Sequence, residues 1–479
     1  MNDMSLMNLQ AEKTWVGAAA IEALAAGLRG RVLEASDSSY DEARAIWNAM
    51  IDRRPALIVQ CAGAADVVNA VRFASDNKLL VSVRGGGHNI AGNAVCDGGM
   101  MIDLSPMKSV RVDVAAKRAW VEPGATLADV DKETQAFSLV VPTGINSTTG
   151  IAGLTLGGGF GWITRKYGLT IDNLVSVDVV TANGELVRAS AKENSDLFWA
   201  LRGGGGNFGI VTAFEFRLHE LRPQVLSGLV VHPFADAQAV LQQYRQALET
   251  APDELTCWVV MRQAPLLPFL PQEWHGKEIL ILVICWCGDI AEGEKATQRL
   301  RSIGNPIADV VAPHPFAGWQ QAFDPLLTPG ARNYWKSHDF ISLSDPTIGI
   351  LIDAISKLPG PECEIFIAHL GGAVGRVAAG ATAFPQRSSH FVMNVHARWR
   401  EPAMDTACIG WARQLFDAAA PHSAGTVYIN FMPEDEVDRV EAAYGGNYKR
   451  LEEIKRQYDP QNLFRMNQNV RPAGERRAM

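Results

Sequence analysis

Three glycine-dense segments constrain the fold of this 479-residue chain more than any other feature. They are Gly85–Gly87 in "VRGGGHNIAGN", the stretch 143–161 ("TGINSTTGIAGLTLGGGFG") and the stretch 202–209 ("RGGGGNFG"). Glycine has no Cβ and tolerates positive φ, so such loops let the backbone approach a neighbour or a ligand closely. Their N–H groups can also form concave sites for anions such as pyrophosphate. We therefore expect a large flat or anionic ligand here; ordinary turns would explain any one segment more easily than all three.

The third segment contains a formal G-x-G-x-x-G at Gly204, Gly206 and Gly209. A dinucleotide-binding fingerprint requires a strand before these glycines and a helix after them. Here "SDLFWALR" predicts a helix before the loop, and "IVTAFEF" predicts a strand after it. Because the order is inverted, we reject the Rossmann interpretation. The chain also has no G-x-x-x-x-G-K-[ST], which excludes the P-loop nucleotide hydrolases.

The chain is too long for one hydrophobic core, and its pattern changes along its length. Residues 57–218 alternate short β-rich runs with glycine turns and two helical intervals. Residues 226–431 contain about six strand-like runs, the last of them "TVYINF", and long helical segments between some of them. We predict an α+β protein whose second half is an antiparallel sheet covered by helices on one face. The predicted divisions are 1–222, 223–431 and 432–479, the last ending in a docked, extended terminus.

Charge and composition exclude several classes of function. The formal net charge of −8 is spread along the chain without a basic stripe, which argues against a nucleic-acid partner. No apolar run reaches the roughly 20 residues of a membrane helix, and the first residues lack the pattern of a secretory signal. The 7 cysteines lack metal-type spacing and fit reduced thiols. We expect a cytoplasmic protein without a metal site or a membrane contact; the sequence does not indicate its oligomeric state.

His88 directly follows the first glycine segment. Four roles compete for it: metal ligand, general base, structural hydrogen-bonding group, and covalent anchor for a cofactor. A metal is disfavoured because no second ligand lies nearby at helical or hairpin spacing. The residues alone leave the other three roles open.

Taken together, the motifs resemble the berberine-bridge-enzyme-like oxidoreductases of the vanillyl-alcohol-oxidase superfamily. The match covers nearly the whole chain: "VRGGGHNIAGN", "IDLS", "VEPGATLADV", "GGGFGWITRKYGLTIDN", "DLFWALRGGGGNFGIVTAFEF", "NYWKS", "TVYINF" and "AYGGNYKRLEEIKRQYDPQNLFR". The resemblance implies an FAD cofactor held by a two-subdomain PCMH-type domain. That domain would comprise residues 1–222 and the returning segment 432–479, with residues 223–431 as the substrate domain.

The resemblance implies that His88 bonds covalently to the 8α-methyl group of the flavin. Many relatives form a second bond from a cysteine, but the matching residue here is Asn146, whose amide cannot form a thioether. We therefore expect mono-covalent FAD. Three residues after Asn146, relatives place a gatekeeper residue beside the reactive face of the flavin. A valine there accompanies rapid reaction with oxygen, and a leucine or isoleucine accompanies dehydrogenase behaviour. Thr149 occupies this position, and because threonine has nearly the shape of valine, we expect an oxidase.

The other residues that we expect at the FAD come from the same motifs. They are Arg84, Gly85, Gly86, Gly87, Asn89, Gly92, Thr143, Gly144, Gly150, Gly153, Gly157, Gly158, Gly161, Gly209, Ile210, Val211, Asn430 and Asn467.

The catalytic base is less well defined. Tyr167 matches an active-site tyrosine of the family, although a core aromatic is an equally good interpretation. The usual base is the second tyrosine of a Tyr-x-Asn-Tyr strand, and here that strand reads Tyr428-Ile429-Asn430-Phe431, which leaves Tyr428 but removes the base. Either the substrate is an amine whose neutral form delivers a hydride without a protein base, or another residue substitutes.

Three histidines are candidates for that substitution. A period of two along "HFVMNVHARW" places His390, Asn394, His396 and Arg398 on one face of a predicted strand. If this face looks toward the flavin, His390 and His396 are candidate bases; a solvated surface is the competing interpretation. His369 in "EIFIAHLGG" is the third candidate.

Lys336, beside Trp335 in "RNYWKSHDF", also resembles a family residue, but we expect its ammonium group to be solvated. The sequence thus predicts an FAD-dependent oxidase that takes hydride from a small or medium organic substrate, an amine, N-heterocycle or alcohol, and reduces O2 to H2O2. The alternatives are a dehydrogenase, an oxidative cyclase or oxygenating flavoenzyme, and an FAD-binding protein without turnover. Phe431 is the only sequence support for the last. No single motif names the substrate.

Overall fold

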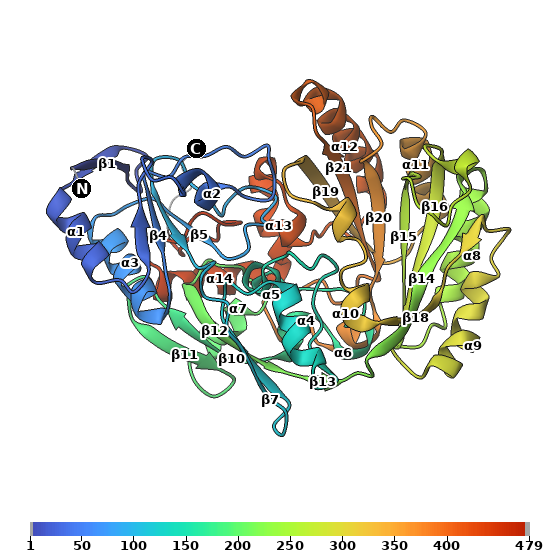
Figure 1. Cartoon of the computed structure of the whole chain (residues 1–479), viewed down its shortest axis with the longest axis horizontal. Coiled ribbons are helices and arrows are strands. Elements are labelled where there is room, and N and C mark those ends of the chain that lie inside the picture. The colour runs from blue at the N-terminus through green and yellow to red at the C-terminus, as the bar shows by residue number, and fades with distance from the viewer. Residues whose placement is uncertain (1–2, 475–479) are drawn as a thin grey trace.

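The computed structural model describes residues 3–474, which form two sheet-and-helix halves that lie side by side (Figure 1). The first half begins with a four-stranded sheet. In order across the sheet its strands are β3 (Arg31–Leu33), β4 (Leu57–Gln60), β6 (Met100–Asp103) and β5 (Val81–Arg84). Strands β4 and β5 both pair with β6 in parallel, so the chain must cross over between them, and α3 (Ala64–Asp76) makes the first crossover. Val67, Val71 and Ala74 share one buried stripe of α3, as helical periodicity requires.

A five-stranded antiparallel sheet completes the first half. Its strands, in order, are β11 (Leu186–Ser190), β10 (Leu174–Val180), β12 (Ile210–Arg217), β8 (Arg118–Val121) and β7 (Val110–Asp113). Three helices belong to the same region: α4 (Leu127–Gln135), α5 (Ile151–Leu156) and α7 (Ser195–Leu201). The third glycine segment runs from α7 to β12, which confirms the inverted helix-then-strand order and the rejection of a Rossmann loop.

The second half is an eight-stranded antiparallel sheet. Its order is β17 (Ala308–Asp309), β14 (Gln224–Pro233), β16 (Glu278–Trp286), β15 (Leu255–Gln263), β20 (Glu364–His369), β21 (Phe391–Trp399) and β19 (Arg332–Phe340), with β18 (Ala312–Pro315) also paired to β14. Helices α8 (Ala237–Leu248), α9 (Ile290–Arg301), α11 (Asp345–Ile355) and α12 (Asp405–Ala419) cover one face (Figure 1). Side chains such as Met393 and Val395 form the core beneath the helices, so the other face is free to look toward the first half. The predicted α+β fold and helix-covered antiparallel sheet are confirmed.

Two predicted details of this half were wrong or missed. "TVYINF" is not a strand: Tyr428 is extended and Ile429–Phe431 form the 3-10 turn η8. The missed strand is β19, which contains "NYWKS" and pairs with β21 along Arg332–Phe340. The sheet edge is therefore completed by β19, and the segment 428–431 is left to turn into the space between the two halves.

The C-terminal segment returns to the first half, where α14 (Tyr448–Tyr458) packs on α7. The buried Lys455 ammonium lies 2.6 Å from Asp459 Oδ2 and 2.7 Å from the Asn207 carbonyl oxygen. Further along, the Val470 N–H donates to Asn207 Oδ1 over 3.0 Å. The extended terminus is thus docked, as predicted, and its contacts are with the third glycine segment. The divisions at residues 222 and 432 stay a prediction.

Smaller elements connect these parts. They are β1 (Met4–Met7), β2 (Lys13–Val16), α1 (Ala18–Ala26), α2 (Tyr40–Arg44), β9 (Leu139–Val140), α6 (Thr164–Tyr167), β13 (His219–Glu220), α10 (Phe316–Trp319) and α13 (Val440–Tyr444). Within residues 3–474, no helix combines the length and the apolar character needed to span a bilayer.

Candidate active site

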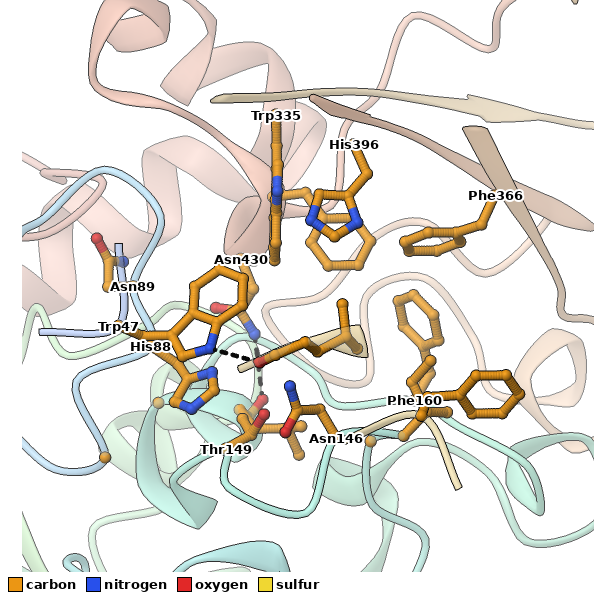
Figure 2. Close-up of a pocket in the computed structure, with 18 of the residues that line it drawn as sticks. Trp47, His88, Asn89, Asn146, Thr149, Phe160, Trp335, Phe366, His396 and Asn430 are labelled. Atoms are coloured by element: carbon orange, nitrogen blue, oxygen red, sulfur yellow. Dashed lines mark hydrogen bonds between the residues drawn. The ribbon is translucent and has the colours of Figure 1, made fainter. Parts of the chain in front are cut away.

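A cavity of about 310 Å³ lies between the glycine-rich loops and the uncovered face of the eight-stranded sheet (Figure 2). His88 and Asn146 line it from the loops, whereas Trp335, Phe366 and His396 line it from three strands of the sheet. Residues far apart in the sequence therefore meet around one space. The cavity has a loop end and a sheet end, and their chemistry differs.

The predicted residues divide into two groups at this cavity. Those that line it are Gly85, Gly86, Gly87, His88, Asn89, Gly144, Asn146, Thr149, Gly150, Gly153, His396, Tyr428, Asn430 and Asn467. The predicted cofactor residues that do not line it are Arg84, Gly92, Thr143, Gly157, Gly158, Gly161, Gly209, Ile210 and Val211. For the second group, contact with the cofactor stays a prediction.

Glycines at the loop end serve two different purposes. A Cβ on Gly86 would lie 2.4 Å from the backbone nitrogen of Gly150, so these two loops need glycine in order to pack against each other. A Cβ on Gly153 would meet nothing within 4 Å, so this glycine leaves open space at the cavity surface. The loops thus allow a ligand to lie close to the backbone at the cavity surface.

His88 is held at the loop end by an aromatic ring and a hydroxyl group. Its ring stacks on Trp47, with ring centroids 5.3 Å apart and an angle of 20° between the planes. The Trp47 indole N–H donates to the Leu327 carbonyl over 3.0 Å, which fixes the stacking partner. His88 Nε2 lies 3.0 Å from Thr148 Oγ1. Burial lowers the pKa of His88 to about 4, so its imidazole is neutral at physiological pH and has a lone pair available for bond formation.

An aromatic cluster occupies the middle of the cavity, where the resemblance places the family's base. The Phe431 ring centroid lies 5.5 Å from that of Trp335, 5.7 Å from that of Phe366 and 5.8 Å from that of Phe160. All three contacts are close to edge-to-face, which is a favourable arrangement for aromatic rings. A phenyl group that cannot accept a proton therefore fills this part of the lining.

Tyr428 lines the cavity next to Phe431, but its hydroxyl is poorly suited to accept a proton at neutral pH. Burial raises the pKa of Tyr428 to about 12. The hydroxyl oxygen accepts hydrogen bonds from the Gly159 N–H over 3.1 Å and from Asn430 Nδ2 over 2.8 Å. Tyr428 is thus a neutral phenol that fixes Asn430 at the cavity.

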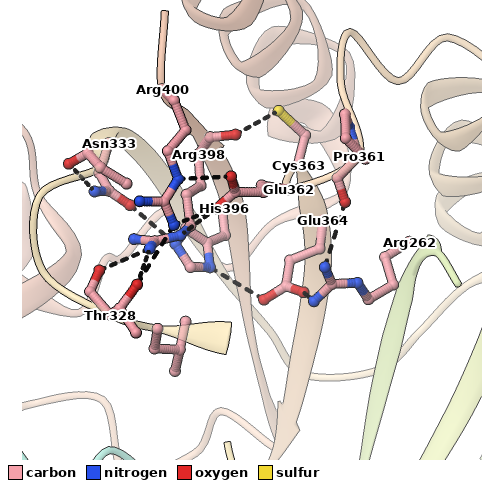
Figure 3. Close-up of polar contacts among 12 residues, drawn as sticks. Arg262, Thr328, Asn333, Pro361, Glu362, Cys363, Glu364, His396, Arg398 and Arg400 are labelled. Atoms are coloured by element: carbon pink, nitrogen blue, oxygen red, sulfur yellow. Dashed lines mark hydrogen bonds and ion pairs between the residues drawn. The ribbon is translucent and has the colours of Figure 1, made fainter. Parts of the chain in front are cut away.

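A polar network forms the sheet end (Figure 3). Glu364 lies 2.6 Å from Arg262 Nη1 and 3.1 Å from His396 Nδ1. Burial alone would raise the pKa of Glu364, but Arg262 and His396 lower it to about 2, so the carboxylate is ionised. His396 Nε2 lies 3.3 Å from Asn333 Oδ1, and Asn333 Nδ2 donates to the Ala331 carbonyl, so the amide oxygen faces the ring. Both nitrogens of His396 are therefore directed at protein acceptors.

The remaining catalytic candidates lie elsewhere. His390 is exposed and precedes β21, so the strand period does not apply to it. His369 is buried beside Arg165, with 3.0 Å between His369 Nε2 and Arg165 Nη1, and burial holds its pKa well below the usual value. The Tyr167 hydroxyl donates to the Glu220 carbonyl over 3.0 Å. The structure does not bring these three candidates to the cavity lining, which leaves Tyr428 and His396.

The expectation that Lys336 is solvated was wrong. Its ammonium group is buried and lies 2.9 Å from Glu436 Oε1 and 3.4 Å from Asp435 Oδ1. Neighbouring side chains on a strand point to opposite faces, and Trp335 lines the cavity, so Lys336 points to the helix-covered side. Its role is to pair with the segment after Phe431.

Sequence reasoning missed much of the sheet end. The missed lining residues, at the sheet end and elsewhere around the cavity, include Trp47, Phe160, Trp162, Trp258, Arg262, Phe323, Glu364 and Phe366. Arg262 pairs with Glu364, Glu364 with His396, and His396 with Trp335, so one row crosses four strands. Only the strand register reveals this row, although alternation along "CWVVMRQ" signals that Trp258 and Arg262 share a face.

The architecture and the cavity define a class of protein. The loop end offers a glycine-lined surface beside a neutral imidazole, which fits the isoalloxazine ring of a flavin. Aromatic rings and the polar network line the rest of the cavity, which leaves a compartment for a substrate. Such a two-part cavity is the arrangement of a flavin-linked oxidoreductase.

Comparison with known proteins identifies the family. Residues 55–190 match the model of the FAD binding domain, and residues 427–471 match the "Berberine and berberine like" model. An FAD-linked oxidoreductase of Dictyostelium discoideum is 32% identical over 89% of this chain and 91% of the relative. (R)-6-hydroxynicotine oxidase of Paenarthrobacter nicotinovorans is 31% identical over 93% of this chain and 98% of the relative. The solved structure of BBE-like 1 from Physcomitrella patens is 25% identical, with a TM-score of 0.86 over 95% of this chain and all of that one (100%).

The chain therefore belongs to the berberine-bridge-enzyme-like family of FAD-linked oxidoreductases. It is an enzyme that uses FAD.

Proposed function

We propose that this protein is an oxidase that holds FAD through one covalent bond from His88 and oxidises a small or medium aromatic amine or N-heterocycle. The neutral His88 ring at the cavity surface carries this proposal. Because Asn146 cannot form a thioether, the proposed attachment has no second bond. Thr149, at the cavity lining, supports the choice of an oxidase.

The residues of the loop end would bind and orient the cofactor. Gly153 leaves room for a flat ring, Trp47 fixes the plane of His88, and Asn146 and Asn430 offer amide groups to the ring edge. Bound FAD would supply the chemistry of hydride acceptance, with dioxygen as the final electron acceptor and hydrogen peroxide as the product. The protein's share of the chemistry is positioning and the control of protons.

The cavity lining supports an aromatic substrate over a sugar. Trp258, Phe366 and Phe431 line the cavity with ring carbon. The charged groups of the sheet end are already paired with one another. A polyol placed there would leave several hydroxyl groups without partners, at a cost of about 1–3 kcal/mol each. The relative whose printed name is (R)-6-hydroxynicotine oxidase supports the same choice.

The lack of a suitable proton acceptor in the cavity lining supports an amine substrate over an alcohol. An alcohol must lose its O–H proton as the hydride leaves, and among the lining residues Phe431 cannot accept it, Tyr428 is a neutral phenol, and His396 has both nitrogens engaged. A neutral amine delivers hydride without a protein base, because its nitrogen lone pair stabilises the cation that forms. An alcohol remains the second candidate, since His396 would become available if its contact with Asn333 opened.

A spectroscopic experiment tests the proposal. Purified enzyme is mixed anaerobically with a panel of aromatic amines, N-heterocycles, benzylic alcohols and oligosaccharides, and the visible flavin absorbance is followed; air is then admitted in a stopped-flow instrument. We expect bleaching by a neutral amine or N-heterocycle and recovery within seconds, with one peroxide per turnover. Recovery only with an artificial acceptor would identify a dehydrogenase, and no bleaching by any compound would support an FAD-binding protein without turnover.

Localisation in the cytoplasm is also part of the proposal. The seven cysteines, all within the described residues, are free and buried, which supports a protein that keeps its thiols reduced. Fractionation of the source cells, with the protein detected by antibody, tests this point; recovery from an extracellular fraction would contradict it.

A further inference from the structure

We infer that Asp324, in the second half of the chain, is a positioning residue that holds the turn 146–149 in place at the loop end of the cavity. The inference goes beyond the proposed function, because it requires only that the enzyme binds FAD and is independent of the substrate and of the electron acceptor. Asp324 belongs to residues 320–327, a segment that we call the strap.

The turn 146–149 presents two side chains to the cavity. Asn146 and Thr149 both line it, on the same side as His88 (Figure 2). The turn closes through the Thr149 N–H, which donates to the Asn146 carbonyl over 3.1 Å. So short a turn depends on contacts with the rest of the protein to keep one conformation.

The first half of the chain holds two carbonyl groups of this turn. The Ala128 N–H donates to the Ser147 carbonyl, and the Leu127 N–H donates to the Thr149 carbonyl, each over 2.9 Å. These bonds leave the N–H and the hydroxyl group of Ser147 to a different partner.

Asp324 binds both of these donors with one carboxylate. The Ser147 N–H donates to Oδ1 over 2.9 Å, and the Ser147 hydroxyl donates to Oδ2. Ser147 is buried at this contact. Two bonds to different oxygens fix the orientation of Ser147 as well as its position, and hydrogen bonds to a carboxylate are roughly twice as strong as neutral ones.

The strap is anchored on both sides of Asp324, so the carboxylate reaches the turn from a fixed base. Before it, Gln320 Nε2 donates to the Gly144 carbonyl over 3.1 Å. After it, the Leu327 carbonyl accepts the Trp47 indole N–H over 3.0 Å. Between these two anchors lies the 3-10 turn η4 (Asp324–Leu326).

The strap is also a wall of the cavity. Phe323 and Leu326 line the cavity on its inner side, whereas Gln321 and Ala322 are exposed on its outer side. The Phe323 ring centroid lies 5.8 Å from that of Trp162, which lines the cavity too. The contact through Asp324 therefore joins a wall of the second half to the turn of the first half.

This contact should affect the cofactor through the order of the turn. A turn that is ordered before FAD binds adds no ordering entropy to the cost of binding, whereas a mobile turn must be ordered at that moment. Loss of the Asp324 carboxylate should therefore weaken FAD binding even where the fold is intact.

The affinity for FAD, measured in a His88→Ala background, tests the inference. His88 cannot hold FAD covalently in this background, so the result does not depend on the proposed attachment. FAD-loaded protein is diluted, and the fluorescence of released FAD gives the dissociation constant. We expect Asp324→Ala to raise it about tenfold or more, Asp324→Asn to raise it less because one acceptor oxygen is kept, and Ser147→Ala to raise it about threefold.

A double variant and a matched control sharpen the test. Ser147→Ala combined with Asp324→Ala should bind FAD no more weakly than Asp324→Ala with Ser147 intact loses through both bonds, because the hydroxyl acts through the carboxylate. Asp289→Ala is the control: this carboxylate accepts the Ala291 and Glu292 N–H groups at the start of α9 and does not line the cavity. It should lower the urea midpoint and leave the dissociation constant of FAD unchanged.

Two further measurements separate positioning from a general loss of stability. Hydrogen exchange of the FAD-loaded protein, followed by mass spectrometry, should become faster in the peptide with residues 146–149 in Asp324→Ala and at the start of α9 in Asp289→Ala. The visible absorbance bands of the flavin should change in Asp324→Ala alone, because only this variant alters the cofactor's surroundings.

Three results would overturn the inference: an unchanged dissociation constant in Asp324→Ala, an equal rise in Asp289→Ala, or additive effects in the double variant. If Asp324→Ala does not fold, Asp324→Asn and Ser147→Ala supply the same comparison with Asp289→Ala. The proposed oxidase activity is judged separately, with substrates and air, and its failure leaves the FAD affinities of these variants as they are.

Discussion

The two ends of the cavity each present a histidine, and the two rings differ in their side-chain hydrogen-bond partners. At the loop end, the one side-chain hydrogen bond of His88 among the described residues joins Nε2 to the Thr148 hydroxyl. At the sheet end, His396 lies between the Glu364 carboxylate and the Asn333 amide oxygen. Fewer side-chain partners suit the covalent attachment proposed for His88, whereas partners at both nitrogens suit a fixed wall at His396. The proposal thus separates the two histidines by their hydrogen-bond partners and not by their presence in the cavity.

The two ends also differ in what holds them together. The loop end depends on close backbone contact, as between Gly86 and Gly150, while the sheet end depends on buried charges, as in the pair of Arg262 and Glu364. Substitutions should therefore damage the ends by different mechanisms, and the following predictions test that difference.

The largest loss of stability is expected from a substitution at the sheet end. Glu364→Gln leaves Arg262 buried without its counter-charge, which should lower the free energy of unfolding by about 3–5 kcal/mol. Asp353→Asn, in the exposed pair with Lys357, is the matched control and should cost less than about 1 kcal/mol. Urea unfolding at pH 7 measures both. Equal losses in the free energy of unfolding of the two variants would contradict a larger contribution from the buried ion pair of Glu364.

A pH series tests the same carboxylate. The pKa of Glu364 is lowered from 4.5 to about 2 in the folded protein, so its contribution is present above pH 4.5 and is lost as the pH falls toward 2. This corresponds to about 3 kcal/mol. The stability difference between wild type and Glu364→Gln should therefore shrink as the pH is lowered from 4.5 to 3. A difference that stays constant over this interval would contradict the lowered pKa.

A smaller effect is expected from overpacking at the loop end. Gly86→Ala forces two backbone segments apart and should cost about 2 kcal/mol of stability, measured by urea unfolding. Gly153→Ala is the matched control: its Cβ meets no protein atom within 4 Å, so stability should be unchanged or slightly higher, while FAD binding weakens. If Gly153→Ala binds FAD as well as the wild type does, this glycine does not face the cofactor.

The smallest effect is expected from a change of pH on the rate of covalent attachment at His88. The His88 pKa of about 4 implies that the reactive neutral ring is almost fully populated from pH 5 upward. The rate of covalent attachment should therefore be flat between pH 5 and 8 as far as His88 is concerned, and should fall only as the pH drops through about 4. A rate that halves near pH 6.5, the ordinary value for histidine, would show that the ring is solvated.

The sequence predicted more of the cavity lining at the loop end than at the sheet end, for a physical reason. Glycine segments and His88 are local features, and local features can be recognised without knowing the fold. The row from Arg262 through Glu364 and His396 to Trp335 depends on the register of four strands, which no short motif encodes.

Two local predictions failed where tertiary contacts overrode propensity. The β-rich run "TVYINF" turns at Ile429–Phe431 because the eight-stranded sheet ends at β19, and the Asn430 amide bonds instead to Tyr428 and to the Leu154 carbonyl. Lys336 was expected in solvent, yet strand alternation places it beside Glu436 in the interior. In both cases the deciding partner lies far away in the sequence.

The most direct measurement is intact-protein mass spectrometry after acid denaturation, on wild type and on His88→Ala. We predict one added FAD mass in the wild type and none in the variant, which would show that His88 is the only point of attachment. An unmodified wild-type mass with free FAD in the supernatant would contradict covalent attachment and reduce His88 to a hydrogen-bonding residue. An adduct that persists in His88→Ala would place the bond on another residue.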